Sequence, residues 1–371
     1  MKILALNWND LKNPYAGGAE VQLEEMLRRM VQYGHEVTLF CSGFRGCAKE
    51  EVVEGIRIIR RGFRYNFNLV APFGLRPLVA NEKFDIMVED INKIPFYTPL
   101  YLDIKTLVLI PHLFATTVFY ETNFLLGSYV YLAEQPLVRM YKGCDFQCPS
   151  KSTRDELIER GVPADKVTIV NNGIDENFFV YDPAVPKYDR PTVLYLGRIK
   201  KYKSVQHLIE AFARVREKLN DAQLMIVGAG GYTDNLKRQA SSLGLTDCVE
   251  FPGFVSAENK LERLRRSHVA VLPSLKEGWG LTNIEANAVG TTVIAANTPG
   301  LRDSVRDGET GFLFEYGNID ELTNRLMRVL TNEEQRKQLE KNGRVWADNF
   351  SWDKSAKHFE QELLRLTEGQ E

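Results

Sequence analysis

The sequence lacks the features that mark a disulfide-rich, zinc-binding or membrane-spanning protein. Its five cysteines are scattered, and none shows the CxxC spacing of a zinc or redox site. The first residues show no signal-peptide pattern. The richest apolar run, TLVLIPHLFATTVF, contains Pro111 and His112 and falls short of the ~18 residues that a spanning helix needs. We therefore expect reduced thiols and a cytoplasmic location, with peripheral contact at the inner face of the membrane as an alternative.

The sequence also lacks an excess of one charge. Lysine and arginine number 47 against 49 aspartates and glutamates, which gives a formal net charge of -2. Nucleic-acid-binding proteins depend on many contacts between basic side chains and phosphates, and this composition gives no electrostatic reason to expect them. We predict that nucleic acid is not a partner.

The length of 371 residues exceeds the ~250 at which single domains usually stop growing, so two domains are expected. Strand-like segments alternate with helix-length segments along the chain, a pattern typical of parallel α/β sheets. The stretch 174–191 contains three prolines and no sustained period, which is typical of a linker. Apolar residues at helical spacing predict helices over 19–30, ended by Gly34, and over 205–215, and a short helix is expected at 152–161, capped by Ser152 or Thr153. Strands are expected at 2–7, 35–40, 83–89, 106–110, 166–170, 191–197, 222–228, 248–251, 269–274 and 291–296.

The segment KEGWGLTNIEA places Glu277 and Glu285 around a glycine pair, between an expected strand and a helix that begins near Thr282. The free N–H groups of a helix start bind anions, and Gly278 and Gly280 would let a phosphate come close. A simpler interpretation is a capping box, with Thr282 at the N-cap and Glu285 three residues later. A glycosidase also needs two facing carboxylates, but that interpretation leaves the glycines without a role.

This segment resembles the E-x7-E signature of the retaining glycosyltransferases of family 4, whose usual form is EGFGL; Trp279 stands here in place of Phe. The likeness runs from a Gly-Gly loop near the N-terminus to the FSW segment before the last helix. It implies the GT-B fold, an α/β architecture of two Rossmann-like parallel-sheet domains facing across a cleft. Residues 1–175 would bind the acceptor, residues 176–352 would bind the nucleotide sugar, and the helix in 353–371 would pack back on the first domain.

The resemblance also implies roles for individual residues. Glu277 would bind hydroxyls of the donor sugar, Glu285 the ribose, and the main-chain N–H groups of Leu281 and Thr282 the diphosphate. In NPYAGGAE, the backbone of two glycines would approach the donor phosphate and the acceptor, although a simple turn into a helix is an alternative. The expected donor-binding residues are Gly17, Gly18, Gly253, Phe254, Gly278, Trp279, Gly280, Leu281, Thr282 and Glu285.

A leaving diphosphate needs positive charge, and the chain contains no DxD motif to gather a divalent metal ion. The segment LGRIKKYKS offers Arg198 and Lys203 instead, and both side chains suit phosphate oxygens. An exposed basic loop is the alternative. Family 4 has an Arg and a Lys at this spacing, generally followed by Gly, where this chain has Ser204. His112 matches the histidine of the family that contacts the reacting sugar.

We therefore predict a metal-independent and cofactor-independent hexosyltransferase that keeps the anomeric configuration, with Arg198, Lys203, Glu277 and His112 as catalytic residues. The donor is expected to be a nucleoside diphosphate sugar, with UDP-hexose favoured over GDP-mannose. The acceptor is expected to be a glycan, a lipid-linked sugar or a small molecule, as in polysaccharide biosynthesis. Gly173, in the segment NGID, and the linker that follows it are the expected hinge.

Three other functions fit parts of the sequence. IVGAGGY follows a strand as in dinucleotide-binding oxidoreductases, but Thr233 stands where their fingerprint has its third glycine. A non-hydrolysing sugar-nucleotide epimerase shares the architecture. A non-catalytic carbohydrate- or membrane-binding protein is suggested by GIRIIRRGFRYNF, in which four basic residues lie close to aromatics. These are Arg57, Arg60, Arg61 and Arg64, and a surface strand and loop is the plainer interpretation.

Overall fold

The computed structural model describes residues 1–120 and 122–368, and the chain divides into two compact units. Unit 1 comprises Met1–Gly173 and Trp352–Glu371, and unit 2 comprises Ile174–Ser351. The chain therefore crosses between the units twice, once after Gly173 and once after Ser351. These crossings lie next to the expected limits at 175 and 352. The last three residues of the helix expected at 353–371 fall outside the described residues.

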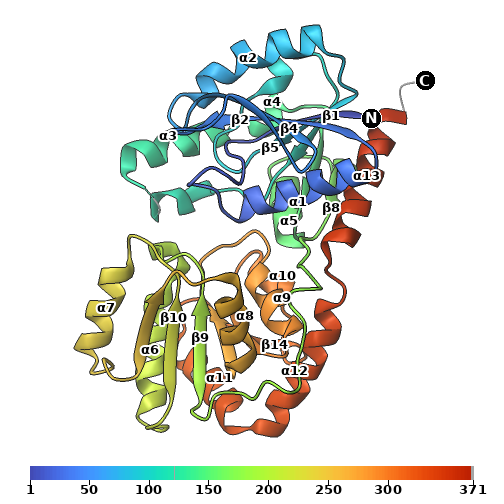
Figure 1. Cartoon of the computed structure of the whole chain (residues 1–371). Helices are drawn as coiled ribbons and strands as arrows, with labels where there is room; N and C mark the ends of the chain where they lie inside the picture. Colours follow the sequence, from blue (N-terminus) through green and yellow to red (C-terminus); the bar gives the residue numbers. More distant parts are fainter. Residues whose placement is uncertain (121, 369–371) are drawn as a thin grey trace. The chain divides into compact units, whose positions relative to one another are not determined.

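Unit 1 is built on one sheet with the strand order β3-β4-β2-β1-β5-β6-β7-β8 (Figure 1). All neighbours in it run parallel except β3 and β4, which are antiparallel. The central strands are mainly apolar and, apart from Lys2, buried, as a parallel sheet covered on both faces requires. The strands are β1 (Lys2–Leu6), β2 (Glu36–Gly43), β3 (Glu50–Val53), β4 (Ile56–Phe63), β5 (Ile86–Asp90), β6 (Thr106–Leu109), β7 (Asp145–Cys148) and β8 (Val167–Ile169).

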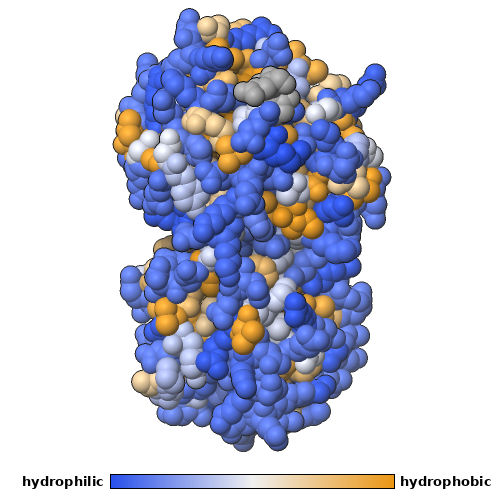
Figure 2. All heavy atoms as spheres, turned by 90° about the vertical axis from the view of Figure 1, so that its right-hand side faces the viewer, coloured by the Kyte–Doolittle hydropathy of each residue, from blue (hydrophilic) through white to orange (hydrophobic). Residues whose placement is uncertain are grey.

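The helices of unit 1 come from both ends of the chain. The last one, α13 (Trp352–Glu368), packs beside α1 (Gly18–Gln32), and its Phe359 is fully buried in the same apolar cluster as Leu23. Arg29 Nε donates to Asp353 Oδ1 at 2.6 Å and fixes the start of α13. The outward side of α13 is polar, and Figure 2 shows mainly hydrophilic residues on this side. The other helices are α2 (Phe67–Asn81), α3 (Phe124–Glu134), α4 (Leu137–Met140) and α5 (Lys151–Glu159), with short 3₁₀ turns at Thr98–Leu100, Ala115–Tyr120 and Ala164–Lys166.

Unit 2 is built on an entirely parallel sheet with the order β11-β10-β9-β12-β13-β14 (Figure 1). In chain order this is 3-2-1-4-5-6, the doubly wound arrangement, and the order reverses between β9 and β12. The strands are β9 (Thr192–Leu196), β10 (Gln223–Val227), β11 (Val249–Gly253), β12 (Val269–Leu272), β13 (Thr292–Ala296) and β14 (Gly311–Phe314). The helices are α6 (Val205–Arg216), α7 (Thr233–Ser242), α8 (Ala257–Arg266), α9 (Leu281–Ala288), α10 (Leu301–Ser304), α11 (Ile319–Thr331) and α12 (Glu333–Ala347), with a 3₁₀ turn at Lys201–Lys203.

The expected cap of the helix at 152–161 was wrong. The N-cap of α5 is Ser150, which has an extended backbone and accepts a hydrogen bond from Thr153 N at 3.2 Å. A second helix, α2, was not expected at all, because Pro72 and Pro77 lie inside it. Burial of Phe67 and two apolar residues one and two turns later holds α2 on the sheet despite these prolines.

The basic patch expected at Arg57–Arg64 is largely neutralised. Arg60 is 2% exposed and binds Asp10 Oδ2 and Glu51 Oε1, each at 2.6 Å. Arg57 pairs with a carboxylate on the loop after α2, and Arg61 pairs with one on β3. Arg60 thus belongs to the interior of unit 1, and the expectation that all four arginines form one surface patch was wrong. Within residues 1–120 and 122–368, no helix is both long enough and apolar enough to cross a bilayer.

We predict that Phe359→Ala lowers the free energy of unfolding of unit 1 by about 3 kcal/mol, because it opens a cavity between α13 and the sheet. Urea denaturation followed by far-UV circular dichroism measures this change. Lys357→Ala, an exposed change on the same helix, is the control and should stay within about 0.5 kcal/mol of the parent. Equal effects of the two substitutions would contradict the packing of α13 into this core.

Candidate functional site

The loops after β9 and β12 meet in unit 2 where the strand order reverses. Ligands of doubly wound sheets bind in the crevice at this point, because neighbouring loops diverge there to opposite faces of the sheet. Leu275 N donates to Tyr202 O at 2.9 Å and joins the two loops. Lys203 Nζ also forms an ion pair with Glu277 Oε1. Two of the residues predicted to be catalytic are thus brought together from separate segments.

Lys203 and Glu277 are only 13% and 18% exposed in their side chains. Burial is the largest single influence and acts to lower the pKa of Lys203. The charge of Glu277, its hydrogen bond and the nearby hydroxyls of Tyr202 and Tyr195 together outweigh burial and hold this pKa above its ordinary value. The lysine therefore stays cationic at every physiological pH. Arg198 is exposed at the start of the same loop, two residues after β9, and its main-chain oxygen accepts a hydrogen bond from the Tyr195 hydroxyl at 2.9 Å. Both predicted cations thus follow β9, one buried and paired and one facing solvent.

Ser204, where the family generally has glycine, adopts the left-handed conformation with φ 55° and ψ 30°. This conformation costs an L-residue roughly 1 kcal/mol, and glycine adopts it freely. The serine is fully buried, and its hydroxyl lies 3.2 Å from Tyr202 O and 2.9 Å from the Tyr316 hydroxyl. The backbone here takes the left-handed form that a glycine adopts freely, so a serine at this position is compatible with that form of the loop.

The helix α9 begins one residue earlier than expected. Its N-cap is Gly280 with φ 79°, so the capping box built on Thr282 and Glu285 is not formed. Leu281 and Thr282 occupy the first two helical positions, whose N–H groups have no acceptor within a helix. The helix mouth therefore presents main-chain donors beside the two loops, as the anion-site interpretation requires.

A third loop, which follows β13 and carries Pro299 and Gly300, contacts the main chain of Glu277. This loop was not predicted to belong to the site. Glu277 N donates to Pro299 O at 3.1 Å, and a Cβ added to Gly300 would lie 2.1 Å from Glu277 O. Gly300 also has φ 82°, so both its backbone and its surroundings require glycine. The signal was present in the sequence as the turn dipeptide Pro-Gly after the strand TTVIAA.

Glu285 is buried on α9 and bound by a residue that sequence reasoning missed. Lys260 Nζ on α8 lies 2.7 Å from Glu285 Oε1. Glu285 Oε2 is buried without a hydrogen-bond partner in the part of the chain that the structure describes. Burial raises the pKa of Glu285, and the charge of Lys260 opposes the rise. No spacing in the sequence connects residues 260 and 285, because they lie on different helices.

The aromatic residues of the predicted site face in different directions. The Trp279 ring is 4% exposed and lies 5.0 Å from the Phe350 ring, within an apolar cluster of unit 2. Any contact between position 279 and a donor is therefore left to the main chain. Phe254, by contrast, is 88% exposed after Gly253, which ends β11 with φ 75°.

Close packing of the main chain explains two of the glycines in IVGAGGY, Gly228 and Gly230. Cβ atoms added to Gly228 and Gly230 would each lie 1.9 Å from a main-chain oxygen, of Gly197 and Ile199 respectively. Ile199 N donates to Ala229 O at 3.0 Å across this contact. The segment therefore needs glycine to pack its backbone against the loop that carries Arg198, and a dinucleotide is not required to explain it.

In unit 1, the predicted residues lie at the carboxyl ends of β1 and β6. Gly17 is the extended N-cap of α1 and donates its N–H to Glu20 Oε2 at 2.7 Å. A Cβ added to Gly18 would meet no described atom within 4 Å, so the fold of unit 1 does not itself require glycine there. His112 follows β6, and its ring lies 4.8 Å from the Phe114 ring.

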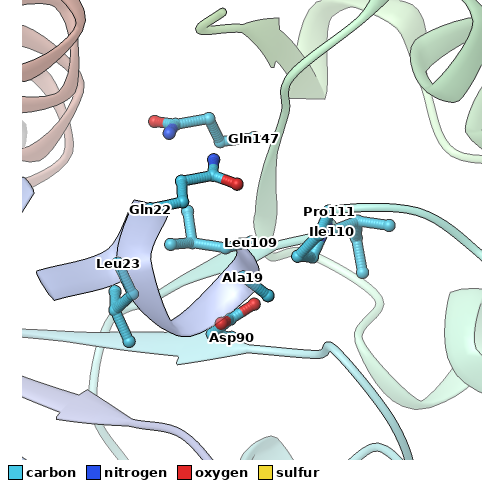
Figure 3. Close-up of a pocket in the computed structure, with 8 residues that line it drawn as sticks. All are labelled: Ala19, Gln22, Leu23, Asp90, Leu109, Ile110, Pro111 and Gln147. Atoms are coloured by element: carbon cyan, nitrogen blue, oxygen red, sulfur yellow. The ribbon is translucent and has the colours of Figure 1, made fainter. Parts of the chain in front are cut away.

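Unit 1 also holds a buried carboxyl that sequence reasoning missed. Asp90 ends β5 and lines a small cavity of ≈ 10 Å³ together with Gln22 of α1 and Gln147 of β7 (Figure 3). Neither carboxyl oxygen has a partner among the described residues, and burial raises the pKa of Asp90 well above its ordinary value. A protonated Asp90 fits such surroundings better than an unpaired carboxylate. No group of three or more His, Cys, Asp or Glu side chains that could hold a metal ion occurs between residues 1 and 368, position 121 left aside.

We predict that Gly300→Ala lowers the affinity of unit 2 for UDP or GDP at least ten-fold, because the new methyl group displaces the main chain at Glu277. Isothermal titration calorimetry on the full chain measures this affinity. Gly308→Ala is the matched control, since Gly308 has a similar φ of 75° but no described atom near its Cβ. The control should lose stability and keep affinity; an equal loss of affinity in both variants would refute the supporting role of this loop.

Models of known protein families match both halves of the chain. The family model "Glycosyltransferase Family 4" matches residues 16–178, and the model "Glycosyl transferases group 1" matches residues 181–346. The chain is 28% identical to the GDP-mannose-dependent alpha-(1-6)-phosphatidylinositol monomannoside mannosyltransferase of Mycolicibacterium smegmatis, across 91% of this chain and 92% of that protein.

Among solved structures, sucrose-phosphate synthase from Thermosynechococcus elongatus superposes with a TM-score of 0.83 at 20% identity and 99% coverage of both chains. Anabaena HepE in complex with UDP and glucose superposes with a TM-score of 0.78 at 18% identity, covering 98% of this chain and 99% of the other. These likenesses show the GT-B fold, as predicted. The two family matches together span nearly the whole sequence, and the chain belongs to glycosyltransferase family 4, whose members transfer a sugar from a nucleotide-sugar donor.

Proposed function

We propose that this enzyme transfers a hexosyl group from a nucleoside diphosphate hexose to an acceptor hydroxyl with retention of the anomeric configuration and without a metal ion. The observation that carries the proposal is the ion pair between Lys203 and Glu277 beside the start of α9. It brings a cation and a carboxylate together near the main-chain donors at the start of α9 in unit 2. A nucleotide sugar has a diphosphate and a sugar next to each other and fits this combination.

The diphosphate would lie at the start of α9. Its leaving oxygen gains negative charge as the bond to the sugar breaks, and fixed donors that meet this charge lower the barrier. Lys203 and Arg198 would supply positive charge, and the N–H groups of Leu281 and Thr282 would supply hydrogen bonds. The Glu277 carboxylate would accept hydrogen bonds from sugar hydroxyls while it keeps Lys203 in place. These groups together take the role that a divalent cation has in other transferases.

The transfer breaks the bond between the anomeric carbon and the diphosphate oxygen and forms a bond from the same carbon to the acceptor oxygen. In a front-face reaction both events occur on one face of the sugar, and the acceptor proton passes to the departing phosphate. None of the acidic residues of the site is needed as a nucleophile in this account. His112 would contact a sugar hydroxyl, and Gly17 and Gly18 would let unit 1 come close to the phosphate and the acceptor.

The ribose would bind to Glu285. Its Oε2 atom is buried and unsatisfied within the described chain, and a ribose hydroxyl is a donor that would satisfy it. Lys260 holds the other oxygen and favours the ionised, hydrogen-bond-accepting form. Lys260 is therefore a positioning residue, which acts on the nucleotide through Glu285.

UDP-hexose is the proposed donor, and GDP-mannose is the second candidate. The name of the Mycolicibacterium relative contains GDP-mannose, whereas HepE was solved with UDP and glucose. The proposed acceptor is a glycan or a lipid-linked sugar in polysaccharide biosynthesis. A thermal-shift screen of UDP, GDP and their sugars selects the donor, and proton NMR of the product gives the configuration at the new bond. Inversion, a sugar trapped on a side chain, or activity abolished by a chelator and restored by magnesium would refute the mechanism.

We predict that Arg198→Ala and Lys203→Ala each raise the activation free energy by about 3 kcal/mol and so lower kcat roughly 100-fold. Each substitution removes a positive charge that would stabilise the negative charge on the leaving diphosphate. Steady-state release of the nucleoside diphosphate measures the rate. Lys201→Ala, an exposed lysine of the same loop, is the matched control and should keep nearly full activity. Near-normal turnover in the first two variants would contradict the assignment.

We predict that Lys260→Met shifts the pH dependence of nucleotide binding toward higher pH. The pKa of Glu285 is already raised by burial, and removal of the lysine lets it rise further. Affinity for UDP or GDP is measured by calorimetry from pH 5 to pH 8. As the pH is lowered, the affinity of Lys260→Met should begin to fall at a higher pH than the affinity of the parent protein.

The same shift has a consequence for stability. A carboxyl whose pKa is raised in the folded state stabilises the fold below its unfolded pKa and loses that contribution as the pH rises through the folded value. Lys260→Met should therefore be more destabilised at pH 8 than at pH 5. Lys341→Met, an exposed change on α12, is the control and should alter neither profile. An unshifted binding profile in Lys260→Met would rule out its positioning role.

A further inference from the structure

The helix α3 of unit 1 presents large apolar side chains to solvent. Phe124, Leu125, Leu126, Tyr129 and Leu132 are between 49% and 81% exposed, whereas the buried positions of this helix are Gly127 and Glu134. Leu125, Tyr129 and Leu132 follow the helical period and lie on one face. An ordinary surface helix turns its apolar stripe toward the core, and α3 does the opposite.

The neighbouring helix α2 extends this apolar surface. Leu69 and Phe73, one turn apart, are 67% and 79% exposed. Asn68 Nδ2 donates to the Tyr129 hydroxyl at 2.8 Å, and this bond joins the first turn of α2 to the middle of α3. Scattered exposed apolar residues are normal in proteins, but a cluster on two joined helices marks an interaction site. We call this cluster the α2–α3 surface; it consists of Leu69, Phe73, Phe124, Leu125, Leu126, Tyr129 and Leu132.

The charges of the two helices indicate which partner covers this surface. Residues 67–81 and 124–134, all of them described, contain one basic residue, Arg76, and one acidic residue, Glu134. Glu134 is 2% exposed and accepts hydrogen bonds from Phe114 N and Arg160, so it adds no negative charge to the surface. Arg64 lies just before α2, with its guanidinium 4.3 Å from the Tyr15 ring. Neither helix therefore has an exposed carboxylate, whereas Arg76 lies on α2 and Arg64 lies just before it.

Apolar, aromatic and arginine side chains without carboxylates suit the boundary between anionic headgroups and acyl chains. The cations meet the negative surface potential, and the apolar side chains enter the boundary region. The partly neutralised arginines of β4 are not required for this contact. The polar outward side of α13 shows that unit 1 is not apolar all over its surface (Figure 2).

We propose that the α2–α3 surface docks unit 1 on an anionic lipid bilayer, with α3 lying in the plane of the headgroup boundary. The contact is peripheral, since neither helix meets the requirements for crossing a membrane. The proposal concerns unit 1 alone and does not depend on the identity of the donor or the reaction.

The test is co-sedimentation of the full chain with vesicles of equal parts phosphatidylglycerol and phosphatidylcholine. We expect the parent protein to bind them, to bind vesicles of phosphatidylcholine alone much less, and to lose binding in high salt. The double variant Leu125→Glu/Leu132→Glu should bind at least ten-fold less, and Phe73→Ser should bind several-fold less. Val345→Glu, which changes a 65% exposed valine of α12 in unit 2, is the matched control and should bind like the parent.

Circular dichroism and thermal unfolding establish that the variants are folded, which the high exposure of the substituted residues favours. Failure of the parent protein to bind anionic vesicles overturns the proposal, as does undiminished binding by the double variant. Size-exclusion chromatography with light scattering tests whether a second copy of the chain covers the α2–α3 surface instead. A lipid-free dimer that the double variant converts to a monomer would assign the surface to a second copy of the chain and would also overturn bilayer docking.

Discussion

The ion pair between Lys203 and Glu277 fixes the geometry on which the rest of the site depends. Its partners come from loops 74 residues apart and meet only because β9 and β12 are neighbours where the strand order of unit 2 reverses. Removal of one partner of a largely buried pair leaves the other charge uncompensated, so each residue holds the other loop in place. The surrounding structure then has to hold the two loops close together without steric clashes between their main chains.

Backbone geometry meets that requirement at a few positions. Ser204 takes a left-handed conformation directly after Lys203, and Gly300 allows the main chain at Glu277 to pass at close range. Gly228 and Gly230 let another loop pack against the segment that carries Arg198. The three glycines among these positions allow backbone to lie close to backbone. Side chains of the site therefore reach one point from separate loops, as the binding of a diphosphate and a sugar together requires.

Unit 1 combines a buried polar cavity with an apolar surface on α2 and α3. Asp90 at the end of β5 and Gln147 of β7 line one small cavity beside the start of α1, in surroundings that favour the protonated form of Asp90. On the outside, α2 and α3 expose apolar side chains that the core does not need. The C-terminal helix α13 closes the core of this unit, so the two ends of the chain depend on each other for the stability of unit 1.

The sequence by itself determined the features that depend on neighbours along the chain. Apolar runs and helical periods predicted most strands of both sheets, though not β3, β7 or β14, and the buried face of α6. The spacing from Glu277 to Glu285 predicted a helix start that matches a known family. Prolines hid α2 from this reasoning, because burial of its apolar face outweighed their local effect. Only the tertiary structure decided the pairing of Lys260 with Glu285, the burial of Arg60 and the support of Glu277 by Gly300. These contacts join elements far apart in sequence, and strand order and packing set them, whereas spacing along the chain carries only local hydrogen bonding and periodicity.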